Sequence, residues 1–403
     1  MPSSHPPSRQ PPFIWQHADW PTLRVDLSAL APALESARLE QGRLLGLLDA
    51  IGLMPAQEVA RELWVQEALA TAEIEGQRLD LAAVRSSVAR RLGLDVAPGP
   101  ANRSVDGLVD VMQDAVLHCA APLDADRLGR WQSALFPGGT SGVQRIVVGR
   151  WREHLDPMQI VSGTLGREVV HFEAPPSQQV PAQMARWLAW FEATRPLSGE
   201  PAALNGLVRA ALAHLWFETV HPFEDGNGRI GRAVVDMALA QDLAAGHALQ
   251  FSAPIFGMAR RMLAQRAAYY DALNAAQRGS CDVTPWVQWF VHAFAQGCVA
   301  SQAVVRQAVD KAAFRARMAG VGANPRQAKV LERLLAAGSV ELGGVFLGGL
   351  TADKYTKLAN TSKPTATRDL TDLVAKGLLQ VTGQGKGTRY AIAVPGWTQP
   401  VVE

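Results

Sequence analysis

The chain has few cysteines, no long apolar run and little net charge. Its three cysteines, Cys119, Cys281 and Cys298, are odd in number and far apart in the sequence. They predict neither a disulfide framework nor a metal-binding pattern, and a reducing cytoplasm suits them. No apolar run approaches the roughly 20 residues of a membrane span, and the N-terminus lacks the apolar core of a signal peptide. We expect a cytoplasmic protein without a membrane segment, and secretion by a specialised bacterial system stays open.

The net charge of +2 gives no reason to expect nucleic acid binding by the chain as a whole. What the chain does have is length and apolar content. Its 403 residues, 48% of them hydrophobic, predict two or three domains with sizeable cores. Residues 1–12 are rich in Pro and Ser and predict a disordered tail. Apolar periodicity predicts helices over 57–74, 104–120, 125–136, 180–194, 202–219, 260–275 and 301–318, and strands over 144–152 and 159–173.

The most informative stretch is 221–232, which joins two apolar helical runs. Its segment Gly226-Asn227-Gly228 allows φ > 0 and leaves backbone N–H groups uncovered just before a helix begins. Uncovered N–H groups at the positive end of a helix dipole form an anion site. Arg229 and Arg232 are three residues apart, so both can face the same anion. The stretch therefore predicts a phosphate-binding loop.

Two further side chains of this stretch can take part in chemistry. His221 can act as a base near neutral pH, and Asp225 is a carboxylate where a phosphate-bound Mg²⁺ would need one. Together they predict phosphoryl-type chemistry. A purely structural loop is the alternative, but it would not need this set of residues. His214 precedes His221 by seven residues without a carboxylate at metal-ligand spacing, so we expect it to be a core histidine.

The stretch His221-Pro-Phe-Glu-Asp-Gly-Asn-Gly-Arg-Ile-Gly-Arg232 resembles the Fic family motif, H-P-F-x-[D/E]-G-N-G-R-x-x-R, at every fixed position. Most Fic proteins transfer AMP from ATP to a hydroxyl side chain of a target protein. The resemblance implies that His221 deprotonates the hydroxyl and that Asp225 holds Mg²⁺ between the α and β phosphates. It also implies that Phe223 packs inward. The residues that it implies as nucleotide contacts in this loop are Asp225, Gly226, Asn227, Gly228, Arg229, Ile230, Gly231 and Arg232.

A second segment, Thr71-Ala-Glu-Ile-Glu75-Gly76, ends the helix predicted over 57–74. Thr71 and Glu75 are four residues apart and share a helix face, and Gly76 suits the left-handed residue that closes a helix. By itself the segment is typical of a solvated last turn. It is similar to the inhibitory motif of Fic proteins, [S/T]-x-x-x-E-[G/N]. The resemblance implies that Glu75 forms a bidentate pair with Arg232 and keeps the γ-phosphate of ATP from its productive position.

Two other regions are similar to nucleotide-contacting parts of Fic proteins. The strands over 159–173 lie before a Pro-Pro pair, as does the Fic flap, a hairpin that holds the target by β-augmentation. An ordinary surface hairpin is the alternative. The tyrosine pair within 260–275 is similar to one that borders adenine, and core residues are the alternative. The nucleotide contacts implied here are Val170, His171, Phe172, Glu173, Tyr269, Tyr270 and Gln277, the last where a family relative has Asn.

The C-terminal segment 324–395 differs from the rest in charge. It has ten Lys or Arg and five Asp or Glu, whereas the remainder is slightly acidic. Its order of helix, turn, helix and basic-tipped hairpin resembles a winged helix-turn-helix. Thr365, Thr367, Arg368 and Thr371 could then face a DNA major groove, with Lys386 and Arg389 on the backbone. Winged helices also serve as protein-binding or dimer modules, so both uses stay open.

These patterns predict a mainly α fold. The expected parts are a disordered tail (1–12), an N-terminal helical domain with an inhibitory helix (13–103), a Fic catalytic domain with a β-hairpin flap (104–300), a helical connector (301–323) and a winged helix-turn-helix (324–395). We predict a protein adenylyltransferase that uses ATP and Mg²⁺, modifies a Ser, Thr or Tyr hydroxyl of a target protein or of itself, and is autoinhibited by Glu75. Removal of AMP, other Fic-type phosphoryl transfer and a nucleotide-sensing transcriptional regulator stay open, as does a homodimer. A lysine is usual at position 228 in Fic phosphotransferases, so Gly228 disfavours that activity.

Overall fold

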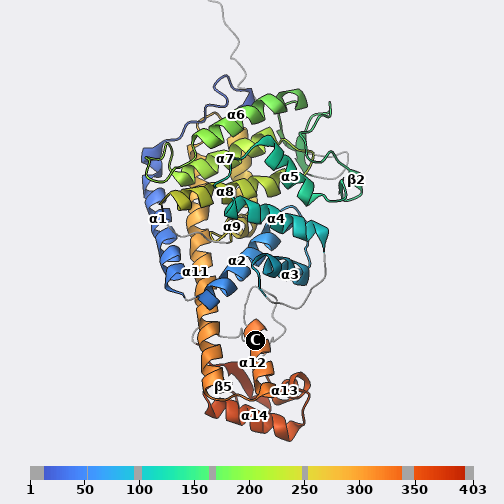
Figure 1. Ribbon diagram of the computed structural model, residues 1–403, viewed down its shortest axis with the longest axis vertical. Helices are drawn as coiled ribbons and strands as arrows, with labels where there is room; N and C mark the ends of the chain where they lie inside the picture. Colours follow the sequence, from blue (N-terminus) through green and yellow to red (C-terminus); the bar gives the residue numbers. More distant parts are fainter. Residues whose placement is uncertain are drawn as a thin grey trace, which may run out of the picture. The chain divides into compact units, whose positions relative to one another are not determined.

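The computed structural model describes residues 13–51, 53–94, 102–162, 169–246, 253–337 and 349–394. The predicted disordered tail lies outside these residues, and so do residues 95–101 of the predicted N-terminal domain. The chain forms two compact units, Met1–Val304 and Val305–Glu403. Helices dominate both units, and the described strands form only two-stranded antiparallel sheets (Figure 1). The structure therefore confirms a mainly α fold.

The N-terminal layer of the larger unit contains four helices, and aspartates cap two of them. The Asp26 carboxylate accepts from backbone N–H groups at the start of one helix, and Asp80 does so at another. The helix that carries Thr71 ends before Gly76, whose φ of 75° suits a glycine at this position. The helices are η1 (Ile14–Gln16), α1 (Leu27–Ala50), α2 (Leu53–Ile74) and α3 (Leu81–Arg91).

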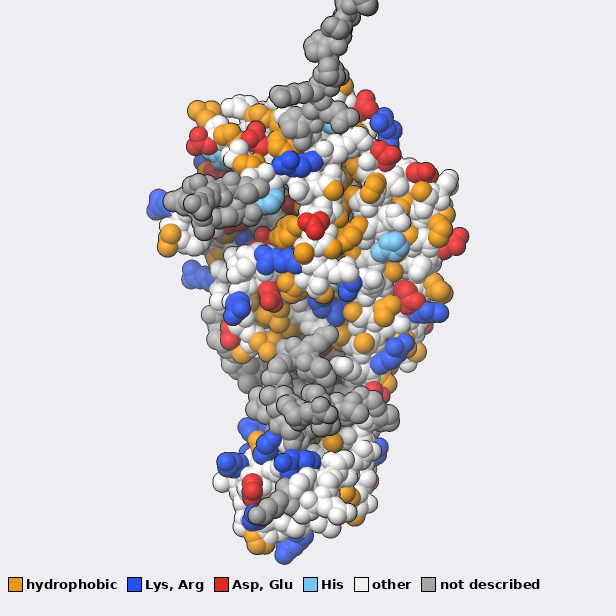
Figure 2. Space-filling model, turned by 180° about the vertical axis from the view of Figure 1, so that it is seen from behind, with side chains coloured by type: hydrophobic (Ala, Val, Ile, Leu, Met, Phe, Trp, Pro, Cys, Tyr) orange, Lys and Arg blue, Asp and Glu red, His pale blue; other side chains and the backbone are white. Residues whose placement is uncertain are grey.

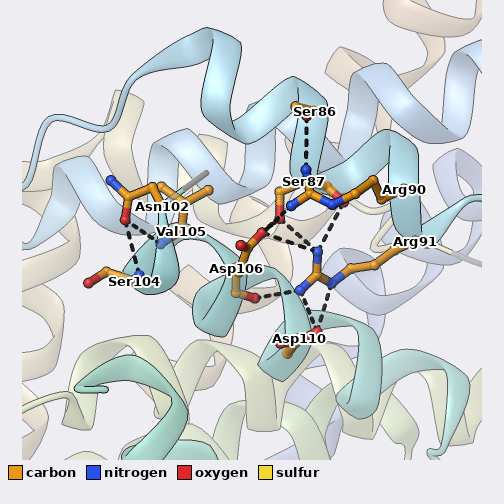
Figure 3. A network of polar contacts seen from close by, with 9 residues as sticks. All are labelled: Ser86, Ser87, Arg90, Arg91, Asn102, Ser104, Val105, Asp106 and Asp110. Carbon is orange, nitrogen blue, oxygen red and sulfur yellow. Dashed lines mark hydrogen bonds and ion pairs between the residues drawn. The ribbon is translucent and has the colours of Figure 1, made fainter. Parts of the chain in front are cut away.

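Ion pairs fasten α3 to α4 (Arg103–Leu117), as Figure 3 shows. Arg90 donates to the Asp106 carboxylate at 2.6 Å. Arg91 lies 2.6 Å from the carboxylate of Asp110 and donates to the backbone oxygen of Asp106 at 2.9 Å. Ser87 donates its hydroxyl to the same Asp106 carboxylate. The layer that contains α2 is thereby fixed to the helices of the central core.

The centre of the larger unit is the pair α7 (Gly206–Val220) and α8 (Asn227–Gly246), which pack on each other. Every residue of α7 is buried, and α8 packs also on α4 and α5 (Ala125–Leu135). The loop between α7 and α8 is therefore held at both ends by buried helices. The remaining helices of this region are η2 (Ser177–Gln179), α6 (Val180–Ala193), α9 (Met258–Ala264), α10 (Arg266–Gln277) and α11 (Thr284–Gly320).

Several predicted boundaries differ from the structure, and four elements differ by more than a few residues or in number. The helix expected from 202 begins at Gly206, because the Asn205 side chain caps it. The helix expected over 260–275 is two helices, α9 and α10, with Gln265 outside helical geometry at φ −118° and ψ 36°. No separate helix begins at 301, since α11 runs unbroken from Thr284. The strand expected over 144–152 has strand pairing only at β2.

Two hairpins belong to the larger unit. One pairs β1 (Thr140–Ser141) with β2 (Gln144–Arg145), and the other pairs β3 (Gln159–Ser162) with β4 (Val169–Glu173). In the second hairpin Phe172 pairs with Ile160 and Val170 with Val161, so the register shifts at His171. This irregularity is a β-bulge, which redirects backbone groups locally.

The smaller unit has its own apolar core, built around Leu331, Tyr355, Leu370 and Leu373. The Tyr355 hydroxyl donates to Asp369, which also pairs with Arg326 at 2.7 Å. Two of its helices and a hairpin follow one another in the predicted order, and a further helix, α12 (Pro325–Ala337), precedes them. The elements that follow α12 are α13 (Ala352–Ala359), α14 (Lys363–Ala375), β5 (Leu379–Thr382), η4 (Gly385–Gly387) and β6 (Arg389–Ile392). Across the described parts of the chain, no helix combines the length and apolar character of a membrane span.

Candidate active site

His221 lies directly after the last turn of α7. Its φ of 50° and ψ of 62° put it in the left-handed region, which is uncommon for a residue with a side chain. Its N–H still donates to the Phe217 carbonyl at 2.9 Å, so it closes the helix, and Pro222 prevents continuation. The His221 side chain is 17% exposed. Strained residues held by their surroundings are a common feature of functional sites.

Arg152 is the residue that holds His221 in this conformation. Its guanidinium donates to the His221 carbonyl at 2.8 Å, to the Val220 carbonyl at 3.2 Å and to the Pro175 carbonyl at 2.5 Å. Its backbone N–H donates to the Pro222 carbonyl at 2.9 Å. Burial lowers the pKa of Arg152 to about 10, so it remains charged at neutral pH. A buried cation thus joins the end of α7 to the segment after the flap.

The Asn227 side chain bonds to the backbone of the same loop. Its side-chain oxygen accepts from the Phe223 N–H at 2.9 Å, and its NH₂ group donates to the Phe223 carbonyl at 2.8 Å. Phe223 is fully buried, as predicted, with its ring 5.0 Å from that of Trp151. The shape of the loop is therefore fixed by its own amide and an inward aromatic ring.

At the N-terminus of α8, two backbone N–H groups of the predicted anion-binding stretch already have partners. The Gly226 N–H donates to the carboxylate of Asp225 at 2.5 Å. The Ile230 N–H already bonds to the Gly226 carbonyl at 3.0 Å, and the Ile230 side chain is fully buried in the core. The available groups are those of the first helical turn, from Asn227 to Arg229.

The carboxylate of Glu75 lies at this helix terminus. Arg232, only 4% exposed, donates to Glu75 at 2.8 Å through one nitrogen. Thr71 provides two more acceptors for the same guanidinium, its hydroxyl at 2.6 Å and its carbonyl at 2.9 Å. The pair is therefore not bidentate as expected: Arg232 bonds Glu75 through Nη2 alone, and Nη2 and Nε also donate to Thr71. A side chain at Gly228 would collide with Glu75, since a Cβ there would lie 2.2 Å from its Oε1.

Arg229 is held by the same N-terminal segment. It donates to the side-chain oxygen of Gln77 at 3.1 Å and lies 3.5 Å from the Asp225 carboxylate. Its guanidinium stacks over the Phe136 ring at 4.8 Å. A cavity of about 350 Å³ opens beside it, lined also by Gln77, Thr140 and Ser141. Both motif arginines thus have partners from the segment 71–77.

Asp225 is the candidate metal ligand, and its side chain is 37% exposed. One carboxylate oxygen accepts from the Gly226 N–H and the other from the Ser141 hydroxyl. Among the described residues, no group of three or more His, Cys, Asp or Glu side chains could hold a metal ion. A single accessible carboxylate fits Mg²⁺, which binds through one or two carboxylates, substrate phosphates and waters. It does not fit a metal held by protein ligands alone.

Two titratable side chains at the end of α7, those of His221 and Glu218, have pKa values shifted so that both are uncharged at neutral pH. Burial, and next the nearby charge of Arg152, lower the pKa of His221 to about 4. Burial raises the pKa of Glu218 to about 8. The Glu218 carboxylate lies 3.8 Å from His221 Nδ1. At neutral pH His221 is therefore unprotonated, as a general base must be, beside an uncharged carboxylic acid.

The predicted flap residues lie in β4, and side chains cover part of it. Arg278 donates to the carbonyls of His171 at 2.7 Å and Val170 at 2.8 Å, which the β-bulge turns to the same side. Trp15 donates to the Glu173 carbonyl at 2.7 Å. Phe172 is buried, with Phe13 packing edge-on against its ring. A target strand could not pair with these three carbonyls unless Arg278 and Trp15 moved away.

The tyrosine pair is divided between core and surface. Tyr269 is buried and bonds through its hydroxyl to Nε2 of His214 at 2.9 Å. Tyr270 is 38% exposed, with its ring centroid 5.0 Å from that of Tyr269. His214 is fully buried, which confirms the expectation of a core histidine. Gln277 is also buried, and in the described part of the chain its Nε2 has no hydrogen-bond partner.

Sequence reasoning missed four residues that shape this site. Arg152, Gln77, Glu218 and Ser141 contact the loop or its partners from outside the motif. Gln77 directly follows the segment Thr71–Gly76, and Glu218 precedes His221 by three residues, so nearness in the sequence could have suggested both. Arg152 is 69 residues from His221, and no local pattern signals that contact.

The Fic/DOC family model matches residues 122–239, and a domain of unknown function, DUF4172, matches residues 13–94. The Fic/DOC range contains the loop 221–232, His221, Asp225 and both motif arginines. The DUF4172 range contains Thr71, Glu75 and Gln77. The two matched ranges thus meet where Arg229 and Arg232 bind the N-terminal segment.

Curated relatives include the protein adenylyltransferases Fic of Culex quinquefasciatus and Aedes aegypti, each 26% identical. The first matches over 60% of this chain and the second over 59%, but each match spans only 41% of the relative. Solved structures include a Fic family protein from Desulfovibrio desulfuricans, 21% identical with a TM-score of 0.48 over 94% of this chain and 99% of that one. Another is Fic-1 from C. elegans, 20% identical with a TM-score of 0.47 over 70% of this chain and 74% of that one. On the family match and the complete motif within it, residues 122–239 are a domain of the Fic/DOC family.

Proposed function

We propose that this protein transfers AMP from ATP to a hydroxyl side chain of a target protein, and that its segment 71–77 holds it in an inhibited state. The observation that carries the proposal is the loop after α7. It combines an unprotonated His221 with a helix N-terminus and two arginines, of which Arg232 is buried against a carboxylate. These are a base and an anion site within one rigid turn, as nucleotidyl transfer requires. The names of the curated relatives support the same activity.

In the proposed reaction His221 takes the proton of the target hydroxyl. The hydroxyl oxygen forms a bond to the α-phosphorus of ATP while the bond from that phosphorus to the bridging oxygen breaks. Pyrophosphate leaves with the bonding electrons. The N–H groups of the first turn of α8 stabilise the charge on the phosphate, and Arg229 and Arg232 bind the outer phosphates. Asp225 would hold Mg²⁺, which neutralises phosphate charge when it is bound.

Inhibition follows from what occupies the anion site. The Glu75 carboxylate lies at the helix N-terminus and against Arg232, where a phosphate of ATP would otherwise bind. A nucleotide that binds beside Glu75 must place its outer phosphates elsewhere. Misplacement of about 1 Å at the reacting centre can cost around 10²-fold in rate. Because the segment belongs to the same chain, this inhibition needs no partner protein.

Label transfer tests the function. Purified Glu75→Gly protein, incubated with a cell lysate and α-³²P-ATP, should label proteins, itself included, beyond the label seen with Glu75→Gly plus His221→Ala, whereas γ-³²P-ATP should give no label beyond that control. Label from γ-³²P-ATP would indicate phosphoryl transfer instead. Release of AMP from labelled proteins without net transfer would indicate removal of AMP. If neither nucleotide gives label, a nucleotide-sensing regulator is favoured and the transferase proposal fails.

A second function, DNA binding, is supported by the smaller unit. On α14 the side chains of Thr367, Arg368 and Thr371 are exposed, and that of Lys363 is 71% exposed. Figure 2 shows Lys and Arg side chains prominent on the visible face of the unit that contains α12–α14. A helix with such an exposed face can enter a major groove. We propose that this unit binds duplex DNA, and a protein-binding or dimer module is the other outcome of its test.

A further inference from the structure

Three buried polar atoms behind His221 lack hydrogen-bond partners within the described residues. They are Nδ1 of His221, Oε1 of Glu218 and Nδ1 of His214. Buried polar groups are nearly always bonded, so each such atom calls for an explanation. Glu218 is 5% exposed and its other oxygen, Oε2, lies 3.8 Å from His221 Nδ1. A shift of about 1 Å would bring this pair to hydrogen-bond distance.

The carboxyl group of Glu218 packs against the neighbouring helix. A Cβ built on Gly231 of α8 would lie 2.3 Å from Glu218 Oε1 and 3.2 Å from His214 Nδ1. The absence of a side chain at Gly231 therefore makes the space that the carboxyl group occupies. This assigns Gly231 a packing role at the back of the histidine. Glu218 itself lies in the last turn of α7, three residues before His221.

Several titratable groups surround Glu218. Burial is the main reason why its pKa is raised; the charge of Arg232 opposes the shift and that of Glu75 adds to it. His214 is also neutral, because burial lowers its pKa to about 3, and Tyr269 bonds to His214 on the far side. Glu218 is thus an uncharged acid, with one oxygen that carries a proton and one that can only accept a hydrogen bond.

We propose that Glu218 is a positioning residue for His221, whose carboxyl oxygen accepts a hydrogen bond from Nδ1–H and so leaves Nε2 bare as the base. This rests on the proposed AMP transfer. A neutral imidazole carries one proton, and the hydrogen bond at one nitrogen decides where it is. Without an acceptor at Nδ1 the proton can move to Nε2, where it would block proton uptake from the target. Catalytic hydrogen bonds are often long in the absence of substrate and shorten in the complex.

The proton inventory is consistent with this role. Before reaction, His221 holds its single proton on Nδ1 and Glu218 holds its own. Nε2 then accepts the proton of the hydroxyl, and the imidazolium that results has both nitrogens protonated. Its Nδ1–H still donates to the Glu218 oxygen, so no proton needs to leave Glu218. The main-chain carbonyl of Glu218 also lies near the ring and raises the His221 pKa slightly, so it is the competing acceptor.

Two substitutions of Glu218 show whether its side chain or its main-chain carbonyl accepts the hydrogen bond from His221. Glu218→Gln keeps an oxygen acceptor of the same length, and Glu218→Leu removes it at similar volume. All variants are made in the Glu75→Gly background, so that autoinhibition is equal. Long-range ¹H–¹⁵N spectra of protein with ¹⁵N-labelled histidines report which nitrogen carries the proton. His221→Ala identifies the His221 signals among the nine histidines of the chain.

The spectra of the parent and of Glu218→Gln should show His221 protonated at Nδ1, and those of Glu218→Leu should show the proton at Nε2 or a mixture. In the transfer assay, kcat should fall about tenfold or more in Glu218→Leu with KM for ATP unchanged, and Glu218→Gln should restore most of it. Equal circular dichroism and melting temperature of the variants establish that the fold is intact. The spectra need no activity, so they remain informative if AMP transfer itself is not observed.

If Glu218→Leu keeps His221 protonated at Nδ1, the main-chain carbonyl is the acceptor and the proposal is wrong. If Glu218→Leu fails to fold, Glu218→Gln decides through the same spectra. In that case His221 protonated at Nε2 in Glu218→Gln would overturn the role, because the amide retains the acceptor oxygen.

Discussion

The loop 221–232 and the exposed face of α14 are both rich in cations, but their surroundings differ. In the loop Arg232 is 4% exposed and bonded to Thr71 and Glu75. On α14 Lys363 is 71% exposed, and its partner Asp353 is 74% exposed. Buried charges are weakly screened, so each of their partners matters, whereas exposed charges act together and weaken with salt. Single substitutions should therefore have large effects in the loop and small, salt-dependent ones on α14.

The strongest effect should come from His221, the proposed general base. In the Glu75→Gly background, His221→Ala should reduce AMP transfer by about 10²-fold or more, because a hydroxyl is a weak nucleophile without a base. ATP binding, measured by calorimetry, should persist, since the arginines and the helix terminus remain. His292, which is exposed on α11, provides the matched control, and His292→Ala should leave transfer unchanged. Near-normal transfer by His221→Ala would mean that the base is another group.

A smaller effect should come from Gln77, the second contact of the N-terminal segment. Gln77→Ala removes the hydrogen bond to Arg229 and should raise transfer by the otherwise wild-type protein about fivefold. Gln77→Glu replaces it with an ion pair and should lower transfer below the wild-type rate. Initial rates with α-³²P-ATP measure both. If the two substitutions change the rate in the same direction, the contact with Arg229 does not contribute to inhibition.

On α14 the expected effect is weaker still. Arg368→Ala should reduce the affinity of the full chain for duplex DNA about threefold and lower the salt dependence by about one released counterion. Fluorescence anisotropy across salt concentrations measures both quantities. Glu332, which pairs with Arg315 in the same unit, offers a control, because Glu332→Gln should not weaken DNA binding. If the wild type does not bind at low salt, the unit is better explained as a protein-interaction module.

The smallest change should appear on acidification. Because the pKa of His221 is lowered to about 4, the residue stays unprotonated as the pH falls from 7 to 6, a range in which Glu218, with its pKa of about 8, stays largely protonated. The kcat/KM of the Glu75→Gly protein should then fall by less than about 1.5-fold, whereas an ordinary histidine would give roughly a threefold loss. Rates at pH 7, 6.5 and 6 with saturating Mg²⁺ distinguish the two outcomes. A threefold loss would mean that His221 is more exposed to solvent than in this structure.

The sequence predicted the loop because the residues that define it are neighbours in the chain. Twelve consecutive residues contain the base, the glycines and both arginines. The resemblance of Thr71-x-x-x-Glu75-Gly76 to the inhibitory motif identified the segment that binds Arg232. What sequence reasoning could not supply is the contact between distant segments. Arg152 reaches the His221 carbonyl across 69 positions, and only the packed structure brings the two together.

Other differences arise where one side chain has two possible partners. An amide such as that of Asn227 can face a ligand or its own loop, and the structure shows that it bonds to Phe223. Adjacent residues of a helix point about 100° apart, so Tyr269 and Tyr270 could not both be equally exposed. The break at Gln265 has neither proline nor glycine beside it, so no helix-stop signal was there to be read.

The most direct test of the account compares two neighbouring glutamates, one in the last turn of α2 and one just after it. Glu75 binds Arg232, whereas Glu73 is exposed two residues earlier on α2. AMP transfer from α-³²P-ATP by wild type, Glu75→Gly and Glu73→Gly is measured side by side. The account predicts a rise of about tenfold or more for Glu75→Gly alone, lost again in Glu75→Gly with His221→Ala. Equal rates for wild type, Glu75→Gly and Glu73→Gly would contradict the account, because the Glu75 carboxylate would then not compete with a phosphate of ATP.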